Sequence, residues 1–161
     1  MEFKEELVKE LKSAERIAIL GVGNELRRDD AAGVAFTKLF KPMASKNVLV
    51  LNCGMTPENF IDKVRRFRPS HVIYVDAVEA SNLPGSIGVF NEGNISTASV
   101  STHRISLALL ISYMRALGVK AKVIVLGVQP KDLSLGEGLS PEVQEAVNLL
   151  ATLFKDALAK R

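Results

Sequence analysis

Two aspartates and one histidine stand where short apolar runs of the chain end, and their side chains can bind a metal ion. Asp30 follows the first run and a glycine-rich turn, Asp76 directly follows the third run, and His103 comes after the fourth. In a sheet of parallel strands, ligands bind outside the carboxyl ends of the strands. Two carboxylates and one imidazole suit a divalent cation of intermediate softness, with positions left open for water or substrate. The spacing therefore predicts a metal-dependent site at this edge of the sheet.

His103 is expected at the start of a helix that runs from about Thr102 to Leu117, with Leu109, among others, at helical spacing. Ser101 or Thr102 can cap this helix, which places His103 in its first turn. The helix dipole disfavours an imidazolium there, so we expect a neutral imidazole that is available to a metal. The other histidine, His71, begins a predicted strand at the opposite edge of the sheet, and we assign it no role.

Each of these residues also has a structural interpretation. Asp29 and Asp30 can simply open the helix predicted up to Phe40, because acidic residues are common at helix starts. Asp76 can be a turn-forming residue after a buried strand. A single helical histidine such as His103 is more often structural than a ligand. The functional hypothesis gains weight because all three loops are expected at one edge.

Other chemistries fit the sequence poorly. A dinucleotide site fails at Leu26, which stands where the G-x-G-x-x-G pattern needs its third small residue. The chain has no Walker loop, no Gly-x-Ser-x-Gly, no His-Glu-x-x-His and no Asp-Thr/Ser-Gly pair. Cys53 ends a strand without an evident histidine partner, so we expect a buried, inert thiol. We expect Arg27 and Arg28 at a solvated loop tip.

Short β-rich runs alternate with helical patterns, which is typical of a mostly parallel sheet covered by helices on both faces. We find no repeat and no linker, so we expect one domain over residues 1–161, in which residues 1–15 add an N-terminal amphipathic helix. The predicted strands are residues 17–22, 48–51, 71–75, 87–90 and 122–128, and the predicted helices are residues 3–14, 29–40, 57–67, 102–117 and a last one that starts at Ser140-Pro141-Glu142.

The composition excludes several classes of protein. The 161 residues include 21 Lys and Arg against 18 Asp and Glu, a small excess that is spread along the chain and is poor evidence for a nucleic-acid binder. A single cysteine cannot form an intramolecular disulfide. No apolar run is long enough to span a bilayer, and the N-terminus lacks the apolar core of a signal peptide. We expect a cytoplasmic protein with no nucleic-acid, membrane or disulfide partner.

Four blocks of the sequence, taken in order, resemble those of the [NiFe]-hydrogenase maturation endopeptidases. This ordered set extends over most of the chain. An aspartate rather than a glutamate at residue 30 resembles the branch that serves formate-hydrogenlyase-type and other membrane-bound hydrogenases. The blocks are Gly21-Val22-Gly23-Asn24 with Leu26, Asp29-Asp30 and Gly33; Asp76-Ala77-Val78-Glu79 with Pro84-Gly85; Ser101-Thr102-His103; and Gly127-Val128-Gln129-Pro130.

The resemblance implies a three-layer α/β/α fold with a twisted, mostly parallel sheet of five strands. It also implies an endopeptidase, historically grouped as aspartic-type, that removes a short C-terminal extension from the hydrogenase large-subunit precursor after nickel insertion. By motif match, Asp30, Asp76 and His103 contact the nickel that the precursor carries, and they serve in catalysis. Gln129 and Pro130 are expected to shape the rim of the site. The alternative is a nickel-sensing chaperone that binds the precursor without cleaving it.

Overall fold

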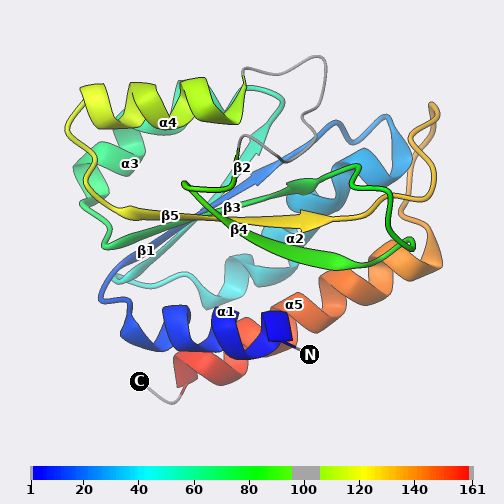
Figure 1. Ribbon diagram of the computed structural model, residues 1–161, viewed down its shortest axis with the longest axis horizontal. Helices are drawn as coiled ribbons and strands as arrows, with labels where there is room; N and C mark the ends of the chain where they lie inside the picture. The colour runs from blue at the N-terminus through cyan, green and yellow to red at the C-terminus, as the bar shows by residue number, and fades with distance from the viewer. Residues whose placement is uncertain (1, 96–105, 160–161) are drawn as a thin grey trace.

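The computed structural model describes residues 2–95 and 106–159 and shows a 5-stranded sheet between two layers of helices (Figure 1). The strand order is β2-β1-β3-β5-β4, in which β4 is antiparallel to β5 and the other pairs are parallel. The elements are α1 (Glu2–Ser13), β1 (Ile17–Val22), η1 (Arg28–Ala31), α2 (Ala32–Phe40), η2 (Lys41–Met43), β2 (Val48–Gly54), η3 (Pro57–Phe60), α3 (Ile61–Phe67), β3 (His71–Ala77), β4 (Ile87–Asn91), α4 (Leu107–Ala116), β5 (Lys122–Val128) and α5 (Pro141–Ala159), where η marks a 3-10 turn.

The two faces of the sheet bury separate apolar clusters because side chains alternate along a strand. In β3, Ile73 and Val75 pack with α1, α2 and α5, whereas Val72 and Tyr74 pack with α3 and α4. Every residue of β1 is buried, as the continuous apolar run at 17–22 predicts for a central strand. The predicted three-layer fold is therefore confirmed.

Helices α2 and α5 are joined by an aromatic cluster beneath the sheet. The Phe36 ring stacks on Phe40 at 5.6 Å between centroids, and the Phe154 ring meets Phe36 edge-on at 5.0 Å. Such aromatic pairs stabilise beyond the area that they bury. The cluster fixes α2, and with it the turn that carries the first acidic block.

The helix predicted from Thr102 begins later in the structure, so this prediction is wrong in its boundary. Helix α4 starts at Leu107, and the Ser106 side chain caps it by accepting a hydrogen bond from the Leu109 N–H at 3.2 Å. Its first turn therefore does not include His103, and residues 96–105 lie outside the described part of the chain.

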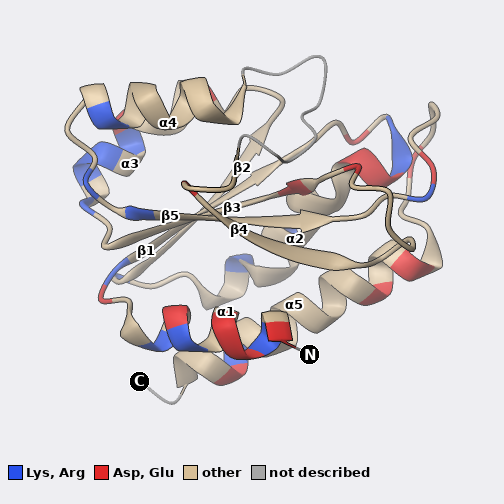
Figure 2. Ribbon diagram, viewed as in Figure 1, with Lys and Arg blue, Asp and Glu red and all other residues tan. Residues whose placement is uncertain are grey.

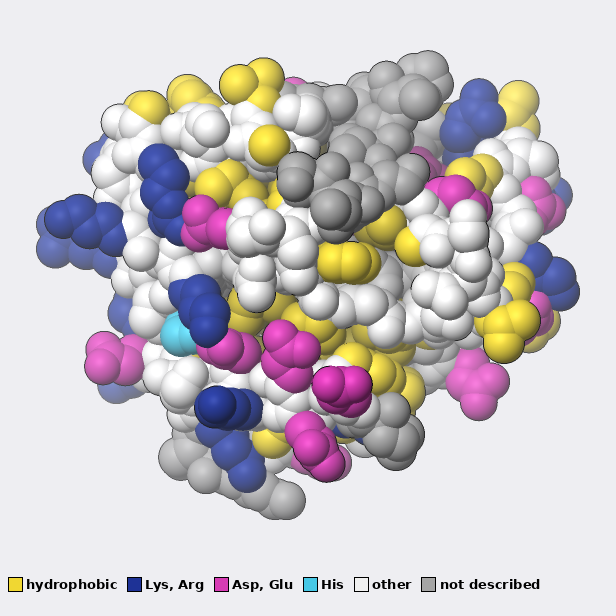
Figure 3. All heavy atoms as spheres, viewed as in Figure 1, with side chains coloured by type: hydrophobic (Ala, Val, Ile, Leu, Met, Phe, Trp, Pro, Cys, Tyr) yellow, Lys and Arg dark blue, Asp and Glu magenta, His cyan; other side chains and the backbone are white. Residues whose placement is uncertain are grey.

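Helix α4 keeps an apolar outer face. Leu109, Tyr113 and Leu117 are 57%, 44% and 37% exposed, although Leu109 and Leu117 follow the apolar spacing of the predicted helix. Apolar side chains accordingly gather over α4 in the space-filling view (Figure 3). Within the described residues, no helix is long and apolar enough to cross a membrane.

Candidate functional site

The strand order creates a topological switch point at the carboxyl edge of the sheet. The chain leaves β1 toward β2 on one side, and it leaves β3 toward β4, which lies beyond β5, on the other side, so the connections diverge between β1 and β3. Ligands bind at such a switch point in open α/β sheets. Asp30 lies in η1 after β1, and Asp76 lies near the end of β3. The structure thus places Asp76 on β3 and Asp30 in the turn after β1, the two strands that flank the switch point.

Asp76 belongs to β3 rather than to a turn after it, so its interpretation as a turn former is wrong. It pairs with Gly127 of β5 and is only 5% exposed. Its Oδ1 accepts the backbone N–H of Ala77 at 2.8 Å. Because strand side chains alternate, Asp76 shares the sheet face of Tyr74, on the side that α3 and α4 cover. Burial of an acid in this place fits a functional role better than a solvated turn.

Asp30 is held in the glycine turn that follows β1. Its Oδ2 accepts the Asn24 N–H at 3.0 Å. A Cβ on Gly23 would lie 1.9 Å from the Asp30 carbonyl oxygen, and a Cβ on Gly33 would lie 2.0 Å from the Val75 carbonyl oxygen. Because these glycines have no Cβ, η1 and α2 can approach the ends of β1 and β3 closely. This close approach brings Asp30 beside the switch point.

Asp29 plays a different part from its neighbour, and the sequence interpretation missed it. Its carboxylate is fully buried and accepts hydrogen bonds from the Lys131, Asp132 and Ser140 backbones and from the Ser140 hydroxyl. Ser140 precedes α5 as predicted, but its hydroxyl donates to Asp29. Since these partners are over a hundred residues away in the chain, no local pattern could reveal them.

Gln129 directly follows β5 at the carboxyl edge of the sheet, and it organises the loop after β3. The side chain is 5% exposed, and its Oε1 accepts the N–H groups of Ala80 at 2.8 Å and Asn82 at 3.2 Å. Its Nε2 donates to Glu79 Oε1 at 2.9 Å, and this hydrogen bond, followed by that of the Ser81 N–H, lowers the pKa of the Glu79 carboxyl. Gln129 thus fixes the residues that immediately follow Asp76.

The third predicted ligand, His103, lies outside the described residues, so its meeting with Asp30 and Asp76 stays a prediction. Residues 2–95 and 106–159 alone contain no group of three His, Cys, Asp or Glu side chains that could hold a metal. His71 lies at the start of β3, at the opposite edge, as predicted.

Cys53 is a buried thiol rather than a nucleophile. It is 2% exposed, and burial, followed by the charge of Glu58, raises its pKa to about 12. A thiol with so high a pKa supplies almost no thiolate at neutral pH.

Arg27 is exposed at the loop tip as predicted, whereas the Arg28 side chain packs against Gly136.

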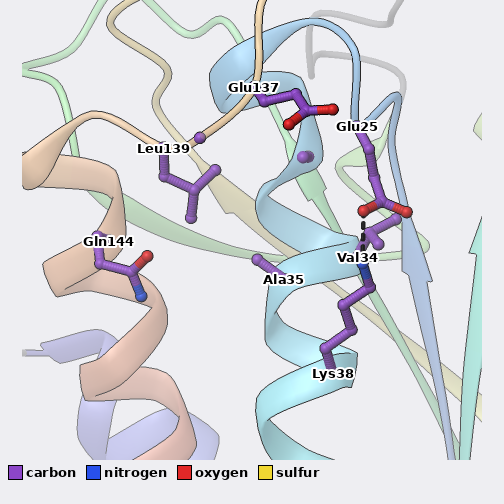
Figure 4. Close-up of a pocket in the computed structure, with 9 residues that line it drawn as sticks. Glu25, Val34, Ala35, Lys38, Glu137, Leu139 and Gln144 are labelled. Carbon is purple, nitrogen blue, oxygen red and sulfur yellow. Dashed lines mark hydrogen bonds and ion pairs between the residues drawn. The ribbon is translucent and has the colours of Figure 1, made fainter.

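A separate cavity of about 360 Å³ opens between α2 and α5 (Figure 4). Val34 and Leu139 contribute apolar walls, and Glu25 pairs with Lys38 at 2.5 Å on one side. Neither predicted aspartate lines it. The switch point beside Asp30 and Asp76, and not this cavity, is therefore the candidate site.

Comparisons with known proteins agree on one family. A family model for the HycI hydrogenase maturation protease matches residues 35–156. A putative hydrogenase maturation protease of Methanocaldococcus jannaschii is 29% identical over 95% of this chain and 96% of its own length. The hydrogenase 3 maturation protease of Escherichia coli is 30% identical over 80% and 82%. The crystal structure of the [NiFe] hydrogenase maturation protease HycI from Thermococcus kodakarensis has a TM-score of 0.85 and 31% identity, covering 95% of this chain and 98% of that one.

Proposed function

This chain belongs to the hydrogenase maturation protease family, and we propose that it is an endopeptidase that removes the C-terminal extension of a [NiFe]-hydrogenase large-subunit precursor after nickel insertion. The observation that carries the proposal is the position of Asp30, just after β1, and of Asp76, near the end of β3, because these two strands flank the switch point. The likeness to a solved maturation protease over 95% of the chain supports the same reaction.

In this proposal the nickel ion arrives with the precursor and is part of the substrate. Asp30, Asp76 and His103 complete its coordination, which docks the scissile peptide beside the metal. Carboxylate and imidazole ligands suit nickel among the divalent metals of intermediate softness. Recognition of the loaded precursor would then depend on the metal, because an empty precursor offers these three side chains nothing to bind.

Cleavage requires a water oxygen to attack the scissile carbonyl carbon and a proton to reach the departing amide nitrogen. The nickel polarises the carbonyl or acidifies the water, and alternatively one of the two aspartates removes the proton of the water. The buried position of Asp76 beside the Ala77 N–H supports a fixed carboxylate near the scissile bond. The chain has no Asp-Thr/Ser-Gly pair, so this chemistry differs from that of pepsin-like proteases.

Mass spectrometry of a cognate precursor tests the cleavage. Nickel-loaded and nickel-free precursor are incubated side by side with the protein, and the intact masses are compared. We expect a short C-terminal peptide to be lost from the loaded form alone. An intact loaded precursor that remains bound to the protein would instead favour the nickel-sensing chaperone.

Replacement of the proposed ligands tests their roles. We expect His103→Ala and Asp76→Asn to lower the cleavage rate by about 100-fold or more, since each removes a group from the reacting centre. X-ray absorption at the nickel edge would report fewer oxygen and nitrogen ligands in a complex with either variant. Normal cleavage by His103→Ala would remove this residue from the site.

The family resemblance also supports the cytoplasm as the place of the reaction, which cell fractionation checks.

A further inference from the structure

The segment Gln129–Asp132, between β5 and α5, contains none of the predicted nickel ligands, yet it is bonded to both acidic loops. One end of it contacts the turn that carries Asp30, and the other end contacts the loop that follows Asp76. The site therefore has a common support.

The first contact is made by Asp29. Its Oδ2 accepts the N–H groups of Lys131 at 2.9 Å and Asp132 at 3.0 Å, together with the Ser140 hydroxyl at 2.8 Å. Its Oδ1 accepts the Ser140 N–H at 2.7 Å, and its own N–H donates to the Asp132 carbonyl at 3.0 Å. Because Asp30 is the next residue, these bonds fix where its backbone lies.

The second contact is made by Gln129. Besides the side-chain bonds to Ala80, Asn82 and Glu79, its backbone N–H donates to the Ser86 carbonyl at 2.8 Å, and its carbonyl accepts the Gly85 N–H at 2.8 Å. Both sides of the loop between β3 and β4 are thus tied to one residue. This loop continues directly from the strand end that holds Asp76.

Only Pro130 separates Gln129 from Lys131, so the two contacts are joined by a very short piece of chain. Pro130 is buried, and its ring fixes φ. We propose that Asp29 and Gln129 are positioning residues that act through this segment as one clamp and set the separation of Asp30 and Asp76. This inference rests on the proposed function for its consequence in catalysis, but its geometry does not depend on it.

The side-chain part of each contact can be weakened or removed with little change in side-chain size, while the backbone bonds stay in place. Asp29→Asn places an amide where donors converge on the carboxylate, and an NH₂ group cannot accept hydrogen bonds. Gln129→Met keeps the length of the side chain and removes both its acceptor and its donor. We expect each variant to lower kcat by roughly 10- to 100-fold with little change in KM, because small misplacement of reacting groups costs rate rather than binding.

Ser70→Ala is the matched control at the opposite edge of the sheet. The Ser70 hydroxyl accepts the N–H groups of Glu15 at 2.9 Å and Arg16 at 3.2 Å and donates to the Arg16 carbonyl at 3.0 Å. Its loss also breaks loop hydrogen bonds, but far from the acids. We expect kcat per folded molecule to stay at the wild-type value. An equal loss of kcat in Ser70→Ala would show that the losses in the other variants come from general destabilisation, and it would overturn the clamp.

A readout that does not require cleavage separates this inference from the proposed function. Amide resonances of the free protein are compared by ¹H–¹⁵N NMR. We expect Gln129→Met to shift the resonances of Asn24 and Asp30, and Asp29→Asn to shift those of Ala80 and Asn82, whereas Ser70→Ala shifts neither set. Shifts confined to the loop nearest each substitution would overturn the clamp, even if the wild-type protein cleaves the precursor.

The double variant supplies the last test. If one clamp holds both loops, Asp29→Asn and Gln129→Met together lower kcat no further than the worse single variant. If the loss of kcat in the double variant instead equals the product of the two single losses, the two supports are independent and the proposal is overturned. If Asp29→Asn does not fold, Ser140→Ala removes one donor to Asp29 and takes its place in every comparison. If the wild-type protein leaves the precursor intact, the proposed function fails and the NMR comparison alone decides the clamp.

Discussion

Polar side chains hold the loops at both edges of the sheet, but with different chemistry. At the amino edge, Glu10 pairs with Lys122 and with His71, whose Nε2 lies 3.3 Å from Glu10 Oε2. At the carboxyl edge, neutral N–H and O–H donors surround the Asp29 carboxylate. The amino edge thus holds the Glu10 carboxylate by opposite charge, whereas the carboxyl edge holds the Asp29 carboxylate by neutral donors. Ion pairs also occur at the carboxyl edge, but their side chains are exposed.

The amino edge is also the more basic of the two. Lys and Arg residues cluster around the ends of α3 and α4 there (Figure 2). The Arg16 guanidinium lies 4.0 Å from the centre of the Phe67 ring and donates to the Phe67 carbonyl at 3.0 Å. These contacts join β1 to the end of α3. We therefore expect substitutions at this edge to change stability alone, and substitutions around the acids at the other edge to change activity as well.

The largest effect is expected from Gly33→Ala at the carboxyl edge. The new Cβ would meet the carbonyl oxygens of Val75 at 2.0 Å and Val22 at 2.5 Å, so the backbone must move. We predict a loss of about 3 kcal/mol or more in the free energy of unfolding, measured by urea denaturation. Gly118→Ala, at a positive φ of 89° with open space, should cost only about 1–2 kcal/mol. Equal losses of unfolding free energy in Gly33→Ala and Gly118→Ala would contradict the close approach of α2 to the ends of β1 and β3.

Arg16→Met is expected to have the next largest effect. It removes the hydrogen bonds to Phe67 and to the Lys46 carbonyl at 2.9 Å and leaves the apolar stem in place. We predict a loss of about 1–3 kcal/mol in unfolding free energy with kcat unchanged. A cleavage defect in a fully folded Arg16→Met protein would show that the amino edge contributes to the reaction.

Glu10 should make the free energy of unfolding depend on pH in the acid range. Burial raises its pKa, but the hydrogen bond and charge of Lys122, with those of His71, outweigh burial and hold the pKa below the ordinary 4.5. Because the folded pKa is the lower one, this stabilisation is present above 4.5 and is lost as the pH falls through the folded value. We predict that Glu10→Gln loses stability at pH 7 but little at pH 3, in urea titrations. Equal losses at both pH values would remove the charge pairing from the amino edge.

Cys53 should give the smallest effect. With its pKa raised to about 12 by burial, then by Glu58, we predict slow reaction with a thiol reagent at pH 8 in the native protein and complete reaction in denaturant. Cys53→Ala should keep wild-type cleavage. Rapid labelling that stops cleavage would place a nucleophile at the carboxyl edge beside the acids.

The strands were predictable because their signal is local. Continuous apolar runs at residues 17–22 and 71–75 predict buried strands, as the structure shows. The glycine turn predicts an acid close to the sheet edge, and Asp30 lies in η1 after β1. The start of α4 was not predictable in the same way, since Ser101, Thr102 and Ser106 are all good caps. Ser106 is the N-cap of α4, because the row of buried residues on this helix begins at Leu107.

The support of the site was out of reach for a different reason. In the sequence, Asp29 and Asp30 are two equivalent acids before a helix. Their difference arises from the segment around Lys131, which is distant in the chain and donates to the Asp29 carboxylate. Gln129 was predicted at the rim, but its bonds to Ala80 and Asn82 depend on the antiparallel return of β4. Long-range hydrogen bonds of this kind leave no period or motif to recognise.

The most direct test of the contrast between the edges is the initial rate of C-terminal peptide release by Asp76→Asn and by His71→Gln. Both are measured on one preparation of nickel-loaded precursor, per folded molecule. We predict that Asp76→Asn falls by about 100-fold or more, whereas His71→Gln cleaves at the wild-type rate. Wild-type release by Asp76→Asn, or equal loss in both folded variants, would contradict a reaction centre at the carboxyl edge.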